Sequence, residues 1–254
     1  MSAAAGFPRL ARLAGFLVPC LLVSLAWADT PEDMVSQTDY LFHNRHLDPG
    51  YFDSALTMLA QARALAPENE AGMALQAAMD IELGDSAVSP GDKFRFYRTA
   101  ECCADTLRSL DSLNPAGHFW WAAAYGSAAL ARGNIYALAA LPAALREFHH
   151  SLEVDSGFAV AYGLLGVIYR ELPAAFGGDL AKARWYFETG FSIDPDLTLL
   201  HLELARLEIK EHRWAAARAQ LNDIMTTDNP SDPAVYFLND RPEAQKLLDE
   251  IRDK

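Results

Sequence analysis

The sequence contains few cysteines. Only three of its 254 residues are cysteine, and the two that lie beyond Ala28, Cys102 and Cys103, are adjacent. Neighbours on a helix point about 100° apart, so we expect neither a disulfide between them nor a disulfide framework. We expect both to be buried packing residues, because free cysteine is among the most buried residue types.

Basic residues are also scarce. Lysine and arginine number 21 against 34 aspartates and glutamates, which gives a formal net charge of −13. Such a surface repels the phosphates of nucleic acids and anionic lipid headgroups. We therefore expect no nucleic-acid partner. The acidity favours solubility and cationic partners, although a solvated acidic surface needs no partner at all.

The short motifs that carry catalysis or bind metals are absent. The sequence has no nucleophile elbow, phosphate-binding loop, zinc-protease motif or carboxylate pair on a defined scaffold. His149 and His150 are adjacent and point apart, and His201 does not share a helical face with Glu203. We therefore expect surface histidines, no metal site, no cofactor and no enzymatic activity.

The N-terminal segment, 1–28, has the layout of a secretory signal peptide. Two arginines precede a mostly apolar run from Leu13 to Trp27, and a small-residue cleavage site ends at Ala28. We predict cleavage after Ala28 and a periplasmic mature chain, residues 29–254, without a membrane span. The alternatives are an uncleaved anchor, for which the run is short, and lipidation of Cys20, which lies within the apolar run rather than at its end.

The sequence does contain a repeated helical spacing. A small residue is followed by an apolar one four positions later, by a third residue three further on, and by a helix-ending residue after five more. This spacing is typical of the second helix of a tetratricopeptide (TPR) unit, a helix-turn-helix of about 34 residues. The copies are Ala55/Leu59/Ala62/Pro67, Cys103/Leu107/Leu110/Pro115, Ala144/Phe148/Ser151/Ser156, Ala183/Phe187/Gly190/Pro195 and Ala217/Leu221/Ile224/Asn229.

These repeats predict an all-α, TPR-like solenoid of about ten to twelve helices that occupies residues 29–254 without an internal boundary. Strands are not expected, because no alternating apolar pattern occurs. Gly84 is predicted to cap a helix that begins near Glu70. Residues 135–142 are predicted to be an apolar connection that lies against another element, followed by a helix to Val154. Residues 231–240 are predicted to be irregular, and 242–252 to form a polar capping helix.

The fourth and fifth units resemble one particular family. Gly177-Gly178-Asp179 is followed by Lys182-Ala183 and Phe187-Glu188, a pattern similar to that of the TatT proteins, which are TPR-containing periplasmic components associated with TRAP transporters. The resemblance extends over about residues 100–254 and is best over 155–225. It implies an all-helical partner of a solute-binding protein, with a channel or cleft for a hydrophobic ligand. Those proteins are often lipid-anchored, whereas this chain lacks a good lipobox and adds an N-terminal unit, residues 31–69.

The candidate ligand- or partner-binding residues are aromatic side chains on neighbouring helices and one glycine-rich insertion. Aromatic residues at helical spacing normally face a core, so simple packing is the favoured alternative. The insertion is interpreted as a loop that closes over the groove, or as an anion-holding turn. A basic–aromatic cluster, Lys93 to Arg98, either touches a partner or lipid heads or simply buries Phe94 and Tyr97. The candidates are Trp120, Tyr125, Tyr162, Tyr169, Phe176, Gly177 and Gly178.

Together these patterns predict an exported, non-catalytic TPR protein. The first hypothesis is an accessory component of a TRAP-type solute transport system that binds a periplasmic protein partner, a small apolar ligand, or both. The alternatives are a general envelope scaffold that binds peptides in its groove, and a subunit that mainly forms homo-oligomers. A transport accessory predicts an apolar tunnel bounded by units three to five, whereas a peptide scaffold predicts an open, polar groove.

Overall fold

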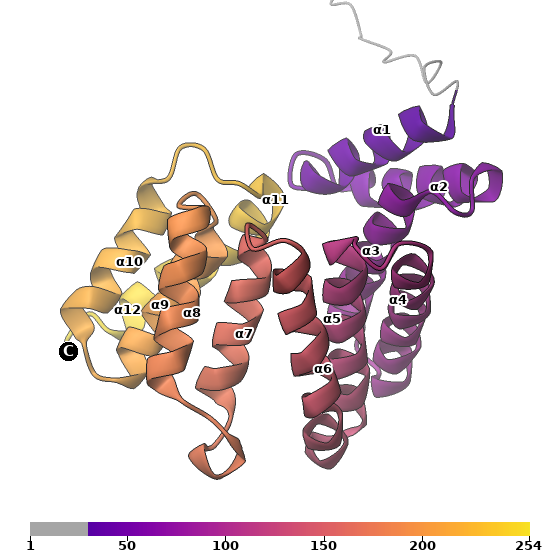
Figure 1. Cartoon of the computed structure of the whole chain (residues 1–254). Helices are drawn as coiled ribbons and strands as arrows, with labels where there is room; N and C mark the ends of the chain where they lie inside the picture. The colour runs from indigo at the N-terminus through magenta and orange to yellow at the C-terminus, as the bar shows by residue number, and fades with distance from the viewer. Residues whose placement is uncertain (1–29) are drawn as a thin grey trace, which may run out of the picture.

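Antiparallel helix pairs stack side by side through the part of the chain that the computed structural model describes, residues 30–254 (Figure 1). No strand occurs within this range, and the predicted all-α repeat fold is confirmed. The predicted signal peptide lies outside the described residues. The five pairs are α1 (Pro31–His43) with α2 (Gly50–Leu65), α3 (Glu70–Ser86) with α4 (Pro90–Leu110), α5 (Pro115–Arg132) with α6 (Asn134–Val154), α7 (Ala159–Glu171) with α8 (Leu180–Ile193), and α9 (Thr198–Lys210) with α10 (Trp214–Thr226).

Side-chain caps fix where several helices begin. Asn69 accepts a hydrogen bond from the backbone N–H of Gly72, Ser89 accepts from Asp92, and Asp179 accepts from Ala181 and Lys182. Each bond satisfies an N–H that lacks a partner in the first turn of a helix. Asp179 is thus the cap of α8.

The repeated spacing is buried where the helices of a pair meet. Its residues are inaccessible or nearly so in α2, α6, α8 and α10. In α4 the predicted register is wrong by three residues, because Ala100, Ala104 and Leu107 are the buried set. Consequently Cys102 is exposed and Cys103 is only partly buried, and the expectation that both are buried packing residues is wrong for Cys102.

Gly84 is an interior residue of α3 and does not cap it. A Cβ atom at Gly84 would lie 2.3 Å from Cε1 of Tyr97 on α4. The hydroxyl of Tyr97 also donates a 2.6 Å hydrogen bond to Asp85. The glycine is thus required by close helix packing, and α3 continues to Ser86.

The prediction of an apolar connection at residues 135–142 is also wrong, because this segment forms the first turns of α6. Gly133, with φ at 122°, makes the sharp turn out of α5. Pro142 lies within α6, where it removes one backbone N–H from the helix. Ala140 on the same helix is buried, so packing holds this extension in place. Some apolar side chains of the extension nevertheless remain in solvent, since Ile135 is 83% exposed.

The C-terminal segment is one nearly continuous helix rather than an irregular stretch and a separate helix. α11 (Pro233–Val235) leads through the π-helical turn η2 (Tyr236–Asp240) into α12 (Arg241–Glu250). In the π turn the N–H of Arg241 reaches the carbonyl of Tyr236, directly before Pro242, which has no N–H to donate. Ala244, Leu247 and Ile251 pack on the core of the last repeat, so the predicted capping role is confirmed.

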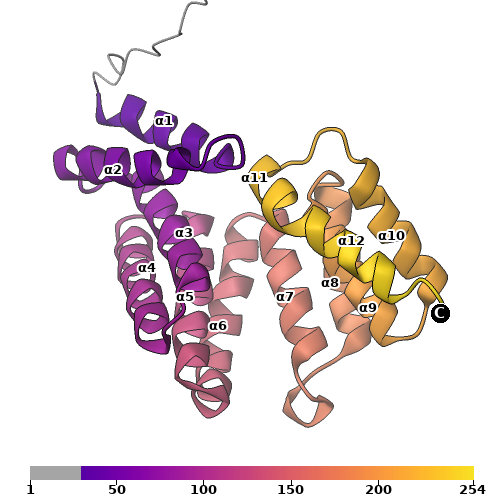
Figure 2. The same cartoon turned by 180° about the vertical axis from the view of Figure 1, so that it is seen from behind.

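The solenoid curves until its two ends meet. The end of α1 lies beside α11 in both views (Figures 1 and 2). The ring of His46 stacks on that of Phe237 with their centroids 4.8 Å apart. The first helices of the pairs, α1, α3, α5, α7 and α9, consequently face a shared interior.

Candidate binding cavity

A central cavity of about 490 Å³ lies on the inner side of this curve. The first helix of every pair, or the turn beside it, contributes to the lining, and the segment of α11 contributes from the opposite side. Most of the lining is apolar. These apolar residues are Phe42, Ala71, Ala74, Leu75, Ala78, Ile81, Phe119, Trp120, Phe158, Val160, Leu197, Leu199 and Val235.

The wall of the cavity is rigid on the side of α5. Phe119 is 2% exposed and makes edge-on ring contacts with Trp120 and Phe158, with centroids 4.8 and 5.0 Å away. On the side of α3 the lining residues Ala74 and Ala78 are one helical turn apart. Their small side chains leave the space that larger residues would fill.

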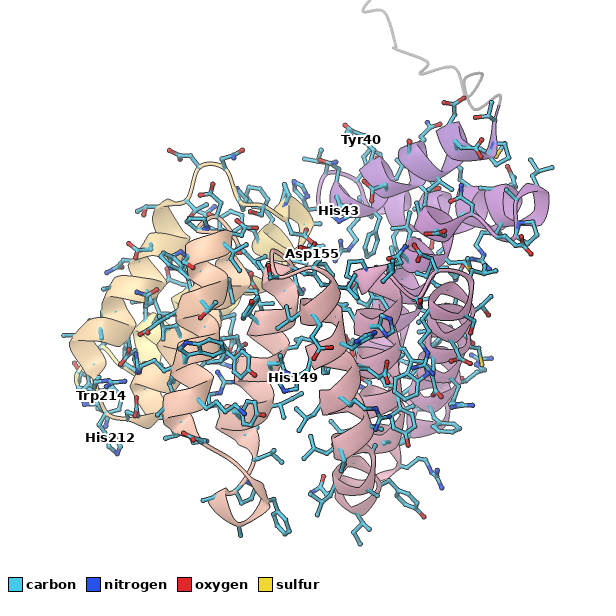
Figure 3. The ribbon with its side chains drawn as sticks, viewed as in Figure 1. Tyr40, His43, His149, Asp155, His212 and Trp214 are labelled. Carbon is cyan, nitrogen blue, oxygen red and sulfur yellow. The ribbon has the colours of Figure 1, made fainter. Side chains whose placement is uncertain are left out.

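The polar residues of the lining gather where α1 approaches α11. His43 Nδ1 lies 3.2 Å from Asp39 Oδ1, and Arg45 lies 3.1 Å from Glu82. Figure 3 shows His43 at the end of α1, next to the segment that carries α11. The hydrogen bond with Asp39 raises the pKa of His43, and the nearby carboxylate of Asp232 adds to this effect. His43 therefore lies between the two ends of the solenoid, where neighbouring carboxylates favour its charged form.

The structure disperses the seven candidate residues over several places. Trp120 lines the central cavity. Tyr125 lines a separate hollow on α5. Tyr162 and Tyr169 are 9% and 8% exposed and pack inside the fourth pair. The ring of Tyr169 stacks on Tyr186 with centroids 5.5 Å apart, so its environment is that of a packing residue.

The insertion between α7 and α8 lies away from the cavity. It contains the short helix η1 (Ala174–Phe176), and Phe176 is 54% exposed. Gly177 adopts φ 92°, and a Cβ at Gly178 would lie 1.8 Å from the carbonyl oxygen of Leu172. Both glycines are therefore explained by the turn itself. The loop follows the end of α7, whereas the cavity involves its beginning, so the loop does not close over the cavity.

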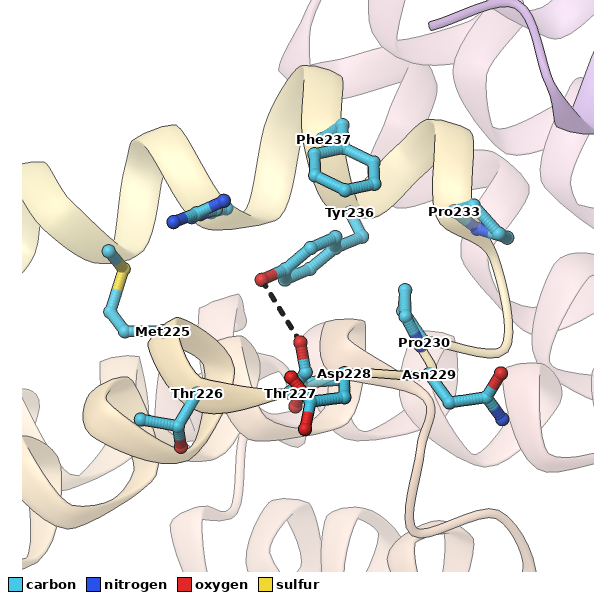
Figure 4. A pocket seen from close by; sticks show the side chains of 10 residues that line it. Met225, Thr226, Thr227, Asp228, Asn229, Pro230, Pro233, Tyr236 and Phe237 are labelled. Carbon is cyan, nitrogen blue, oxygen red and sulfur yellow. Dashed lines mark hydrogen bonds between the residues drawn. The ribbon is translucent and has the colours of Figure 1, made fainter. Parts of the chain in front are cut away.

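Two further hollows lie at the periphery. One, of about 460 Å³, is enclosed by the end of α10 and the turn η2, where the hydroxyl of Tyr236 donates to the carbonyl of Thr227 over 3.4 Å (Figure 4). The other, of about 380 Å³, lies between α4, α5 and α6 and contains Arg98, Tyr125 and Arg132. Neither is bounded by more than a few neighbouring elements.

The expectation of surface histidines is wrong for two residues. His118 and His201 are both 6% exposed. Each places Nε2 about 3 Å from the carbonyl oxygen six residues earlier, of Ser112 and Pro195 respectively. Tyr162 reaches the carbonyl of Ser156 in the same way. These polar residues share one position in three successive units, and this recurrence was the signal in the sequence that could have identified them.

Sequence reasoning also missed the contribution of the N-terminal pair and of α11 to the cavity. Asp39, His43 and Asp232 were not among the candidates, because the contact between α1 and α11 has no local sequence pattern. Within residues 30–254, no group of acidic, histidine or cysteine side chains is arranged to hold a metal ion. None of the helices in that range is long and apolar enough to cross a membrane.

Comparison with solved structures identifies the fold as TPR-like. A thermophilic TPR protein of Thermus thermophilus, TTC0263, is similar over 86% of this chain and 99% of its own, with a TM-score of 0.67 and 19% sequence identity. More distant similarities are to the MamA protein, with a TM-score of 0.45 and 14% identity over 78% of this chain and 97% of that one. The Cut9–Hcn1 hetero-tetramer of the APC/C is similar over 90% of this chain and 46% of its own, with a TM-score of 0.49 and 13% sequence identity. No protein-family model and no curated protein sequence matches the chain.

Proposed function

We propose that this chain is a non-catalytic binding scaffold whose central cavity takes up an apolar segment of a protein partner or a small apolar ligand. The observation that carries the proposal is the composition of the lining, which is apolar except for the few polar side chains near the α1–α11 contact. Concave, mostly apolar cavities with a few polar groups are the usual form of ligand sites. The polar groups at the α1–α11 contact would orient the bound molecule.

The finer proposal is an accessory role in TRAP-type solute transport. It rests on the resemblance of residues 155–225 to TatT proteins and on the apolar character of the cavity. A scaffold for extended peptides would need inward-facing asparagine, lysine or arginine side chains. Of these the described lining contains one arginine, Arg45, which is already paired with Glu82. The cavity differs from the expected tunnel in one respect, because the first two pairs bound it as well as the last three.

Filling the cavity tests the proposal directly. Ala74→Phe and Ala78→Phe place a phenyl ring in the space beside Trp120, and both positions are only partly buried, which allows the protein to fold. We expect the apolar fluorophore N-phenyl-1-naphthylamine to bind the unmodified protein and to bind each variant at least about tenfold more weakly, which corresponds to about 1.4 kcal/mol.

The matched control is Ala60→Phe, which adds the same ring at an exposed position of α2. This variant should bind the fluorophore as the unmodified protein does. Equal binding by all variants, with unchanged circular dichroism, would show that the cavity is not the binding site.

The transport role requires a separate experiment. The mature protein should co-purify with a TRAP-type solute-binding protein expressed alongside it, and Ala74→Phe should reduce the recovered partner. Recovery of no solute-binding protein by a chain that still binds the fluorophore would refute the transport role and leave the cavity proposal standing.

A further inference from the structure

The α5–α6 corner carries an unusual concentration of exposed apolar side chains. Leu130 is 57% exposed, Ile135 83%, Tyr136 48% and Leu138 39%. They surround the sharp turn at Gly133, with Leu130 in the last turn of α5 and the other three in the first turns of α6. Scattered apolar residues are normal on a protein surface, but several that adjoin one another indicate a contact surface.

A second apolar tip projects from the same edge of the molecule. The loop between α7 and α8, residues 172–178, contains only leucine, proline, alanine, phenylalanine and glycine. Its most prominent side chain is the exposed Phe176. The ends of α5 and α7 point the same way in the stack, so both tips project together (Figures 1 and 2).

The charge of α5 and of the first half of α6 differs from that of the rest of the chain. From residue 112 to residue 146 there is no aspartate or glutamate, although the chain has 34 acidic residues. Within this stretch Arg132 lies with its Cζ 4.0 Å from the centre of the Tyr136 ring and 5.9 Å from that of Phe94. Among residues 30–254 no carboxylate lies within ion-pair distance of Arg132, so its guanidinium is available to an external anion.

A hollow beside the tip could receive that anion. The space of about 380 Å³ between α4, α5 and α6 has Arg98 and Arg132 in its lining, with Phe94, Tyr125 and Tyr136 as aromatic walls. Arg98 is ion-paired with Glu101, whose side chain is 11% exposed. The hollow therefore keeps one net positive charge, which matches a single phosphate.

From this arrangement we propose that the α5–α6 corner and the α7–α8 loop dock on a phospholipid bilayer, with a lipid phosphate bound by Arg132. Protruding convex tips with aliphatic and aromatic residues can enter the interfacial region of a bilayer, whereas a protein partner would have to supply two matching cavities. Tyrosine is one of the two residue types enriched in this region, and Tyr136 lies beside Arg132.

The net acidity of the chain does not prevent such docking. Charges separated by more than about 10 Å are largely screened at 0.1 M ionic strength. The bilayer therefore meets mainly the charges at the tips. Glu171 and Asp179 at the base of the second tip are already engaged, the first with Arg170 at 2.8 Å and the second as the cap of α8.

Flotation with phosphatidylcholine vesicles, with and without phosphatidylglycerol, tests this proposal on residues 29–254. We expect the protein to float with the vesicles. Ile135→Ser and Phe176→Ser should each weaken partitioning by about tenfold, because each removes a large apolar side chain that the bilayer would bury. Arg132→Gln should reduce partitioning as well, and free glycerol phosphate should not displace the protein.

Leu113→Ser provides the matched control. Leu113 is 73% exposed but adjoins the start of α5, whereas Ile135 follows its end, about 27 Å away for a helix of 18 residues. This variant should float as the unmodified protein does. The proposal is overturned if the protein stays with the soluble fraction, or if Leu113→Ser lowers flotation as much as Ile135→Ser. Displacement by glycerol phosphate alone would show a small-anion site in place of a membrane contact.

Discussion

The packing of Gly166 against Phe187 allows a quantitative test of the repeat architecture. Gly166 lies on α7, and a Cβ atom there would be 2.3 Å from Cε1 of Phe187 on α8, which is fully buried. Gly166→Ala must therefore separate the two helices or displace a ring that has no free space. Overpacking of this kind costs about 1–3 kcal/mol.

Gly126→Ala isolates that cost, because a Cβ at Gly126 on α5 would meet nothing within 4 Å. Both substitutions gain about 1 kcal/mol of helix propensity. Gly126→Ala should consequently raise the free energy of unfolding by about 1 kcal/mol, or the melting temperature by about 2–4 °C. The free energy of unfolding of Gly166→Ala, measured by urea denaturation, should be about 1–3 kcal/mol lower than that of Gly126→Ala, with an unchanged m-value. Equal stability of the two variants would refute the close packing of α7 on α8.

Two further predictions concern side chains of the second pair. Burial raises the pKa of Asp80 to about 6, so the folded state retains its proton between about pH 4 and 6, and stability falls as the pH rises through this window. Asp80→Asn should remove this loss, so that at pH 7 its free energy of unfolding exceeds that of the unmodified protein by up to about 3 kcal/mol, at 1.36 kcal/mol per pKa unit. The prediction is contradicted if urea titrations give the same stability difference between the two proteins at pH 4 and at pH 7. The exposed Cys102 should react with maleimide before Cys103, whose pKa is raised by burial; mass spectrometry of peptides separates the two, and faster labelling of Cys103 would show that the assigned face of α4 is wrong.

Much of the fold could be predicted because its signals are local. The spacing that identifies α2, α6, α8 and α10 is read within one helix, and burial of those positions follows from helical geometry alone. The register of α4 shows the limit. Ala100/Ala104/Leu107 satisfies the same offsets as Cys103/Leu107/Leu110. Contacts with neighbouring helices distinguish the two, since Ala100 and Ala104 pack with Ala77 and Ala124.

Proline was a weaker guide than the repeats. Pro142 was expected to begin a helix, and the segment around Pro233 was expected to be irregular, yet each lies in or at the start of a helix. The lost hydrogen bond at Pro142 is offset by the burial of Ala140 and Ala144 against the preceding helix. Local propensity is thus overridden by tertiary packing, which a single sequence does not display.

The cavity was the least predictable feature, because it depends on the two ends of the solenoid meeting. The stacking of His46 on Phe237 joins segments that share no sequence pattern, and Phe237 lay in a stretch expected to be irregular. The aromatic candidates were chosen for their positions on neighbouring helices. That criterion finds packing residues such as Tyr169 as readily as it finds Trp120, since both kinds follow helical spacing.

The two proposed surfaces lie at opposite ends of the same helices, and this separation makes them independent. Cavity residues such as Phe119 and Val160 lie in the first turns of α5 and α7. The apolar tips follow the last turns of those helices, about 20–27 Å away at a rise of about 1.5 Å per residue. A bilayer bound at the tips would leave the cavity open to a partner in solution. A substitution at Ala74 should therefore leave vesicle flotation unchanged, and one at Ile135 should leave fluorophore binding unchanged.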